Sequence, residues 1–265
     1  MERTAFPQVG STRVVVLDRN PMTIALVTGA TRGIGLATSR ALAQTGACVL
    51  LTGRNLADAE AAAASLRQEG LDVRPLALDV TSSDSIAAAA EQVARDQGRL
   101  DVLVNNAGVL PEATDATEHH FANPELVRAT FEVNVFGAVA VTEAFLPLLR
   151  RSAGARIVNV STTMGSLSDQ NNPDSPYHPM VVPGYQSSKA ALNSITIGLA
   201  KTLAPAGIKV TAVCPGFVQT ELTPMNKEQA PLTASQAAQV VLAAATLPES
   251  AASGTFVDAL GPVAW

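Results

Sequence analysis

Short apolar segments alternate with helical segments along most of this chain, and this alternation restricts the fold more than any other feature. Seven short runs are typical of buried strands because they are almost continuously apolar. The segments between them show helical periodicity or are rich in Ala, and several end at a glycine. Parallel strands joined by helices form a doubly wound sheet, so the sequence predicts a single-domain α/β Rossmann-type fold with a parallel, seven-stranded sheet. The predicted strands are residues 24–27, 47–52, 73–78, 100–104, 156–160, 209–213 and 254–257, and the predicted helices are 34–45, 55–69, 82–97, 124–150 (bent or interrupted near Pro147), 185–203 and 235–245.

The composition limits the classes of partner. Apolar residues make up 47% of the chain and charged residues 15%, which indicates elements buried on more than one side. The net charge is −5 and no block of Lys or Arg could follow a phosphate backbone, so no nucleic-acid partner is expected. No apolar run approaches the length of a membrane span, and no signal peptide is evident. Cys48 and Cys214 lie in apolar runs, where a buried reduced thiol is expected, and this indicates a reducing compartment. We therefore expect a cytoplasmic protein without a membrane partner, with residues 1–21 as a disordered or dispensable extension and 22–265 as one domain.

A glycine-rich turn follows the first predicted strand. It has the sequence Thr-Gly-Ala-Thr-Arg-Gly-Ile-Gly over residues 28–35 and lies where a strand passes into a helix. Glycines there allow the backbone to approach a pyrophosphate, whose charge is stabilised by the amino end of the helix. The alternative is a tight structural turn, since the spacing differs from the G-x-G-x-x-G pattern. Its position between strand and helix favours dinucleotide binding.

Tyr185 and Lys189 lie four residues apart at the start of a predicted apolar-faced helix. Positions four apart share one face of a helix, so the phenol and the ammonium group can converge. A nearby cation favours the phenolate and lowers the pKa of a tyrosine from its usual value of about 10, which would make Tyr185 a general acid-base. The alternative is a core aromatic residue beside a solvated surface lysine.

Together these features resemble the classical short-chain dehydrogenase/reductase family, in its carbonyl-reductase-like branch, over residues 24–265. The resemblance implies an oxidoreductase that transfers a hydride between a nicotinamide and a small-molecule carbonyl or alcohol substrate. The family's motifs occur here in order at the ends of predicted elements: Thr28-Gly29-x-x-x-Gly33-x-Gly35, Asp79-Val80, Asn105-Asn106-Ala107-Gly108, Asn134, Tyr185-x-x-x-Lys189 and Pro215-Gly216.

The resemblance implies a catalytic role for five residues. Tyr185 would exchange a proton with the carbonyl oxygen, while Lys189 would hold the nicotinamide ribose and depress the pKa of Tyr185. Asn134 would anchor a water that relays protons from Lys189. The substrate-orienting hydroxyl aligns with Thr162, which is favoured over the neighbouring Ser161 although its methyl group would crowd the site.

The resemblance also implies the cofactor contacts, and the end of the second strand favours NADP (NADPH) over NAD. NAD-specific members carry an acid where this chain has Gly53, and Arg54 follows it. Arg32 is a second candidate ligand for a 2′-phosphate, and no acid lies between the two arginines. Asp79 would meet the adenine, and Asn105 is expected to link strands. The predicted cofactor-binding residues are Gly29, Thr31, Arg32, Gly33, Ile34, Gly35, Arg54, Asp79, Val80, Asn106, Ala107, Gly108, Tyr185, Lys189, Pro215, Gly216, Val218 and Thr220.

Two segments depart from the compact family pattern. Residues 170–179 form a polar, proline-rich insertion that is expected to be part of the substrate wall or a neutral surface loop. Residues 223–230 are short and polar in the usual lid region, which indicates an open cleft. His119 and His120 lack companion ligands, so no metal site is predicted.

The sequence leaves several properties open. The substrate, its stereochemistry and the direction of the reaction are undetermined, and the assembly is left open among monomer, homodimer and homotetramer. The alternative to an enzyme is a non-catalytic NADP-binding sensor or scaffold protein with the same fold.

Overall fold

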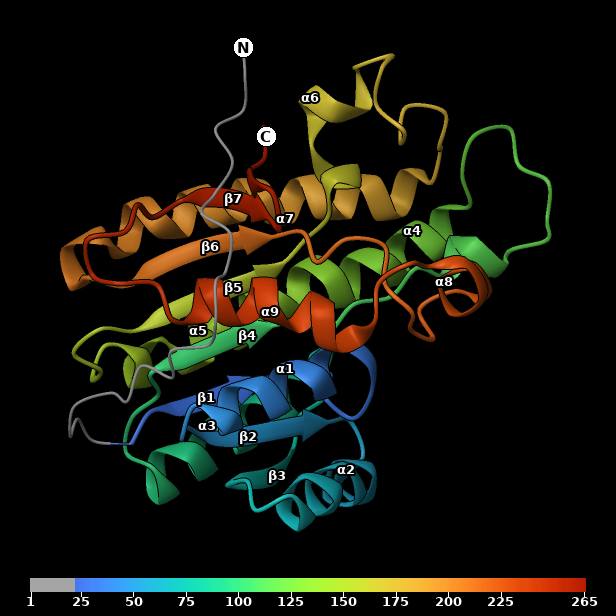
Figure 1. Ribbon diagram of the computed structural model, residues 1–265. Coiled ribbons are helices and arrows are strands. Elements are labelled where there is room, and N and C mark those ends of the chain that lie inside the picture. Colours follow the sequence, from blue (N-terminus) through green and yellow to red (C-terminus); the bar gives the residue numbers. More distant parts are fainter. Residues whose placement is uncertain (1–21) are drawn as a thin grey trace.

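The computed structural model describes residues 22–265, so the extension predicted for residues 1–21 lies outside the described part of the chain. The described residues form one sheet with helices on both of its faces (Figure 1). The strands are β1 (Ile24–Val27), β2 (Cys48–Gly53), β3 (Val73–Ala77), β4 (Val102–Asn105), β5 (Arg156–Val160), β6 (Lys209–Val213), β7 (Thr255–Asp258) and β8 (Gly261–Pro262). The helices are α1 (Gly33–Gln44), α2 (Leu56–Gln68), α3 (Ser83–Asp96), α4 (Pro124–Phe131), α5 (Ala138–Leu149), α6 (Leu167–Gln170), α7 (Pro183–Leu203), α8 (Pro224–Gln229) and α9 (Ala234–Ala245). Shorter turns are η1 (Pro111–Thr114), η3 (Thr163–Gly165), η4 (Ala204–Ala206) and the π-helical turn η2 (Glu132–Gly137).

The strand order is β3-β2-β1-β4-β5-β6-β7-β8. The first seven strands are parallel, which confirms the predicted doubly wound sheet, but an eighth strand, β8, runs antiparallel to β7. The predicted count of seven misses β8 because that strand has two residues and one of them is a proline. The order reverses between β1 and β4, and ligands of open α/β sheets bind beside the carboxyl ends of the strands at such a point.

Alternate residues of each central strand enter cores on opposite faces of the sheet. In β1, Ile24 and Leu26 pack beneath α3, α5 and α7, whereas Ala25 and Val27 pack beneath α1, α2 and α9. Each buried Leu or Ile side chain contributes roughly 1.5–3 kcal/mol relative to an exposed one. This burial on both faces explains why the strands are continuously apolar. Cys48 and Cys214 are both buried and free.

The long helix predicted over residues 124–150 is interrupted at η2 and not near Pro147. Pro147 lies inside α5, two residues before its end, and is exposed, as is Glu143 one turn earlier. The carbonyl that loses its donor therefore faces water, which explains why the helix continues past the proline. Taken together, α4, η2 and α5 (Pro124–Leu149) are long and apolar enough to cross a membrane by length and composition, contrary to the prediction, but half of their most apolar window is buried in this fold.

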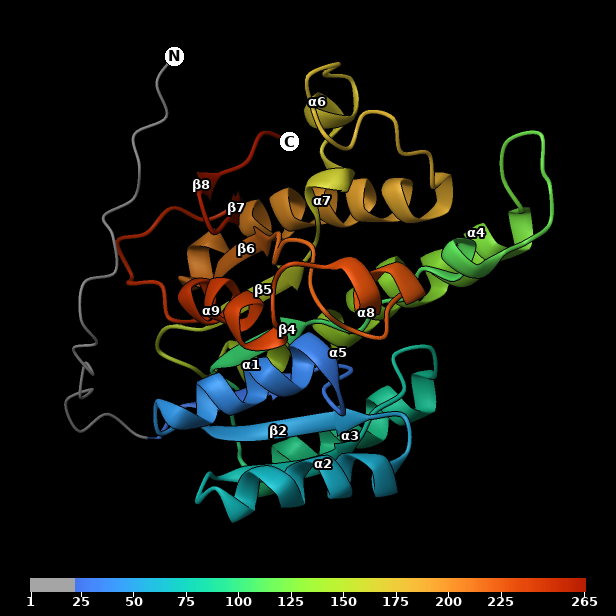
Figure 2. The same ribbon diagram turned by 45° about the vertical axis from the view of Figure 1, so that its right-hand side comes forward.

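Elements that follow the strands gather at one end of the sheet. Residues 223–230, predicted only as a short polar stretch, form α8, whose first turn is capped because the Thr223 hydroxyl accepts a hydrogen bond from the Asn226 N–H (3.0 Å). Figures 1 and 2 both show α8 and α4 beyond the carboxyl ends of the strands, with α6 on an excursion between β5 and α7. These segments surround the edge where a ligand is expected.

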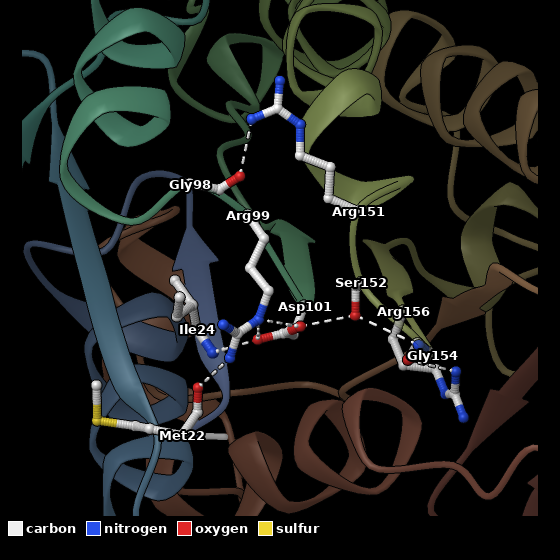
Figure 3. Close-up of polar contacts among 9 residues, drawn as sticks. All are labelled: Met22, Ile24, Gly98, Arg99, Asp101, Arg151, Ser152, Gly154 and Arg156. Atoms are coloured by element: carbon white, nitrogen blue, oxygen red, sulfur yellow. Dashed lines mark hydrogen bonds and ion pairs between the residues drawn. The ribbon is translucent and has the colours of Figure 1, made fainter. Parts of the chain in front are cut away.

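The opposite end of the sheet is closed by polar contacts around Asp101, which precedes β4 (Figure 3). Its carboxylate accepts hydrogen bonds from the Ile24 N–H (2.8 Å), the Arg99 Nε (3.2 Å) and the Ser152 hydroxyl (2.6 Å). The Arg99 guanidinium also donates to the Met22 carbonyl (2.8 Å). One carboxylate thus joins the starts of β1 and β4 to the loop before β5. These contacts lie at the amino ends of the strands, whereas the ligand is expected at their carboxyl ends.

Candidate active site

The glycine-rich turn between β1 and α1 is held by the segment that follows β4. The Thr28 hydroxyl accepts hydrogen bonds from the N–H groups of Asn106 (2.9 Å) and Ala107 (3.0 Å). The Asn106 side chain donates to the carbonyls of Thr28 (2.8 Å) and Gly29 (3.1 Å). A Cβ on Gly35 would lie 2.5 Å from Asn106 Nδ2 and 2.6 Å from the Gly29 carbonyl oxygen, so only glycine allows this packing. Asn106, predicted to contact cofactor, has its amide turned to the glycine turn.

An open pocket of about 750 Å³ lies beside this turn. It contains four of the predicted cofactor residues, Thr31, Arg32, Arg54 and Asp79, at the carboxyl ends of β1, β2 and β3. The remaining lining residues, Asn55, Asp58, Ala61 and Ala62, were not predicted. Asp58, Ala61 and Ala62 recur at helical spacing at the start of α2, a pattern that could have identified them as one face turned to the pocket.

No acid lies between Arg32 and Arg54 in the sequence, but the fold places a carboxylate near each of them. Arg32 is exposed and forms an ion pair with Glu221. Arg54 lies near Asp79, whose pKa is lowered chiefly because the Thr81 N–H donates to its Oδ1 (2.9 Å), with the Thr81 hydroxyl and Arg54 adding to the effect. Asp79 is therefore an anion beside Arg54, and Arg54 is the arginine less committed to a partner.

The remaining predicted cofactor residues line or support the same edge. Gly33 begins α1, and a Cβ placed on it would lie 3.3 Å from the Thr220 methyl group, so the loop after β6 approaches the glycine turn. In that loop Val218 is buried and pairs with Leu232, while Gly216 has a φ of 88°. Val80 is buried against Gly137, and the half-buried Ile34 and Ala107 pack on the two cores. Pro215 follows the buried Cys214 and begins this loop.

Tyr185 and Lys189 lie one turn apart near the start of α7, as their spacing predicts. The Lys189 Nζ lies 5.7 Å from the centre of the Tyr185 ring and donates a hydrogen bond to the Val160 carbonyl at the end of β5 (2.7 Å). Lys189 is 4% exposed, and burial lowers the pKa of its ammonium group to about 8. Burial also raises the pKa of the Tyr185 phenol above its usual value. The predicted lowering of the Tyr185 pKa by Lys189 is therefore wrong for this structure, because desolvation of the phenol is the largest influence on its pKa and no lowering by Lys189 accompanies it.

The two neighbouring hydroxyls after β5 have different surroundings. Ser161 is buried, and its hydroxyl donates to Asn193 Oδ1 (2.6 Å). Thr162 is half-buried and precedes η3, where its hydroxyl accepts a hydrogen bond from the Met164 N–H (3.3 Å). The Ser161 proton is already donated to Asn193, and Ser161 is buried. The Thr162 hydroxyl only accepts a hydrogen bond, so its own proton remains free to be donated to a substrate.

Asn134 lies in the π turn η2 and joins three segments. Its Oδ1 accepts a hydrogen bond from the Val109 N–H (2.8 Å), and its Nδ2 donates to the Val109 carbonyl (3.0 Å) and to the Ser188 hydroxyl (3.1 Å). A Cβ on Gly108 would lie 3.4 Å from Asn134 Oδ1 and 3.6 Å from Lys189 Nζ, so Gly108 lies against both side chains. The structure thus brings together Asn134, Gly108 and Lys189, which are far apart in the sequence.

Asn105 links two strands, as expected from the sequence. Its side-chain amide donates to Asn159 Oδ1 in the adjacent β5 (2.9 Å) and to the Thr142 hydroxyl of α5 (3.0 Å). Among residues 22–265, no group of three or more His, Cys, Asp or Glu side chains could hold a metal ion. His119 instead contacts the Asp115 carboxylate (2.8 Å).

Known proteins resemble this chain over most of its length. The family model described as short chain dehydrogenase matches residues 23–231. A short-chain dehydrogenase of Penicillium roqueforti is 36% identical over 229 residues, covering 84% of this chain and 88% of that protein. The (+)-neomenthol dehydrogenase of Arabidopsis thaliana is 34% identical, covering 88% of this chain and 94% of that protein.

Among solved structures, NADPH-bound carbonyl reductase from chicken fatty liver superposes with a TM-score of 0.79 at 26% identity, over 93% of this chain and 100% of that one. Salutaridine reductase from Papaver somniferum gives 0.75 at 29% identity, over 88% and 99%.

Proposed function

This chain belongs to the short-chain dehydrogenase family, and we propose that it is an NADPH-dependent reductase of a carbonyl compound with Tyr185 as the general acid-base. Membership makes it an NAD(P)-dependent oxidoreductase of small molecules. The observation that carries the proposal is the position of Lys189, which approaches the Tyr185 ring and binds the Val160 carbonyl at the end of β5. Gly108, after β4, lies against both Lys189 and Asn134, and Thr162 follows Val160 by two residues. No single pair of these residues would by itself support the proposed function.

Tyr185 is in the protonation state that reduction requires near neutral pH. A tyrosine phenol is protonated there at its usual pKa of about 10, and burial raises the pKa of Tyr185 further, so it has a proton to donate to a carbonyl oxygen that is gaining negative charge. The accessible Thr162 hydroxyl would donate a second hydrogen bond to the same oxygen. Ser161 supports this arrangement indirectly, because its bond to Asn193 anchors the end of β5 against α7.

The residues around the pocket fit a phosphorylated dinucleotide. Gly29 and Gly33 carry no side chain in the turn that leads into α1, where a pyrophosphate would approach the backbone. Arg54 would bind a 2′-phosphate, and Gly53 carries no carboxylate that would repel it. Lys189 and Thr220 would hold the nicotinamide end. When bound, NADPH would supply the hydride that reduces the carbonyl carbon. The structural relative from chicken liver contains NADPH, which agrees with this choice.

The test is loss of NADPH absorbance with a panel of ketones and aldehydes. General acid catalysis is typically worth about 10²- to 10⁴-fold in rate, so Tyr185→Phe should lose activity to that extent. The chain has two tyrosines, and Tyr177→Phe removes the other phenol. Because Tyr177 lies in the segment expected at the substrate wall, this variant should change KM at most and retain kcat. An unchanged rate in Tyr185→Phe would refute the assignment of the acid. Tight NADPH binding by the wild type with no turnover on any carbonyl would favour the alternative of a non-catalytic sensor.

A further inference from the structure

The helix that carries Tyr185 begins without a local side-chain cap. Its N-cap position is Val182, whose side chain has no hydrogen-bond acceptor, and Pro183 at the first helical position has no N–H. The next two N–H groups, of Gly184 and Tyr185, have no carbonyl partner within the helix. Such groups near the amino end of a helix are normally satisfied by a Ser, Thr, Asp or Asn just before it.

A residue distant in the sequence supplies the missing cap. Glu112 of η1 accepts a hydrogen bond from the Gly184 N–H at Oε1 (3.0 Å) and from the Tyr185 N–H at Oε2 (2.8 Å). Both oxygens of one carboxylate are thus bound to the first turn of α7. Gln186 completes the arrangement, since its Oε1 accepts a hydrogen bond from the Val182 N–H (3.0 Å). The bonding resembles a capping box, except that Gln186 is at the fourth helical position and the acceptor for the first free N–H groups comes from another part of the chain.

Gly184 is adapted to this contact. A Cβ on Gly184 would lie 2.9 Å from Glu112 Oε2 and 3.2 Å from the Val127 Cα in α4. A glycine inside a helix normally weakens it relative to alanine. Here the missing side chain leaves the space in which the carboxylate reaches the backbone.

We propose that Glu112 is a positioning residue for the proton-transfer step, because its carboxylate holds the backbone of Tyr185 in place. Glu112 lies in η1, in the segment that follows β4. Three residues earlier in this segment is Val109, to which the Asn134 side chain is hydrogen-bonded. The segment is therefore tied to α7 twice: at Ser188 through Asn134, and at Tyr185 through Glu112. The negative charge of the carboxylate also interacts favourably with the positive end of the helix dipole. This inference rests on the proposed function, in which Tyr185 donates the proton.

The first test compares three single variants by kcat, KM and NADPH affinity. Glu112→Ala removes both acceptors and should lower kcat roughly 10- to 100-fold, the effect of misplacing a reacting group by about 1 Å. NADPH affinity, measured by fluorescence titration, should stay within twofold, because Glu112 lies outside the cofactor pocket. Glu112→Gln keeps one acceptor oxygen and should recover part of the loss. Ser82→Ala is the matched control: it removes the side-chain cap of α3 and should leave kcat unchanged.

The second test uses Gly184→Ala. Alanine would strengthen an ordinary helix, but here its Cβ would displace the carboxylate, so kcat should fall as in Glu112→Ala. In the double variant the two losses should be far less than additive, because both remove the same contact. Equal kcat in Glu112→Ala and wild type, a similar loss in Ser82→Ala, or fully additive losses in the double variant would each overturn the proposal.

Hydrogen exchange separates this inference from the proposed function. The Gly184 and Tyr185 amides should exchange about tenfold faster or more in Glu112→Ala than in wild type, while amides of α9 should not change. If the wild type reduces no carbonyl, the proposed function fails, and unchanged exchange at these two amides would then also reject the cap. Faster exchange together with a selective loss of kcat would support both.

Discussion

Replacing the buried Lys189 should stabilise the protein at neutral pH while abolishing its catalytic arrangement. Burial lowers the pKa of Lys189 from 10.5 to about 8, and each pKa unit corresponds to about 1.4 kcal/mol between the two protonation states. Keeping this group charged in the folded protein therefore costs about 3 kcal/mol. Lys189→Met removes the charge while preserving most of the side-chain volume.

The sign of the pH dependence follows from the two pKa values. Below pH 8 Lys189 is protonated in both the folded and unfolded states, so the full cost is present. Between pH 8 and 10.5 the unfolded state binds more protons, so the wild type becomes more stable as the pH rises. At pH 9.5 about 1 kcal/mol of the cost remains.

The substitution also removes the hydrogen bond from Lys189 to the Val160 carbonyl, which is worth about 1 kcal/mol at any pH. Lys189→Met should thus be more stable than the wild type by about 2 kcal/mol at pH 7 and about equal to it at pH 9.5. Urea unfolding followed by circular dichroism at both pH values measures this difference. Lys201→Met, at an exposed lysine of the same helix, is the control for the loss of a lysine and should not stabilise the protein at pH 7. A pH-independent difference for Lys189→Met would refute the idea that burial holds its pKa down.

Two further predictions concern the cofactor and the substrate. A carboxylate at Gly53 should favour NAD, but a Cβ there would lie 2.6 Å from the Thr31 methyl, so we expect Gly53→Asp to need Thr31→Ser, which removes that methyl. The double variant should shift the ratio of kcat/KM for NADPH over NADH at least about tenfold toward NADH, and a wild type that already prefers NADH would contradict the role of Arg54. Thr162→Val should lower kcat roughly 10²-fold by removing a hydrogen-bond donor to the carbonyl oxygen, whereas Ser161→Ala should mainly lower the melting temperature. The opposite pattern would assign the substrate contact to Ser161.

The sequence predicts those parts of the molecule that depend on local periodicity. The parallel sheet follows from apolar runs separated by helices, and the approach of Tyr185 to Lys189 follows from their spacing on one helix. The helix over residues 83–96 also begins after its predicted cap, Ser82. In each case the signal and the structure lie within a few residues of each other.

The parts that the sequence does not predict depend on contacts between distant residues or on burial. The pairing of Arg32 with Glu221 joins segments 189 residues apart, and the cap from Glu112 spans more than 70 residues. The pKa of Tyr185 could not be predicted from its spacing to Lys189, because spacing describes attraction and says nothing about how completely the site excludes water. The same limit applies to Arg54 and Asp79, which the fold alone brings together.

The π turn η2 positions Asn134 by means of one extra residue. A π turn holds one residue more than an α-helical turn, so α4 and α5 behave as one helix with a residue inserted at Glu132–Gly137. Because the wider turn takes up that residue within one rotation, deleting it would let a regular helix form with α4 and α5 in nearly their present orientations. The contact between α4 and α7 would survive, whereas the residues inside the turn would move, and Asn134 would no longer point at Val109. A one-residue deletion in this segment should therefore cost activity more than stability.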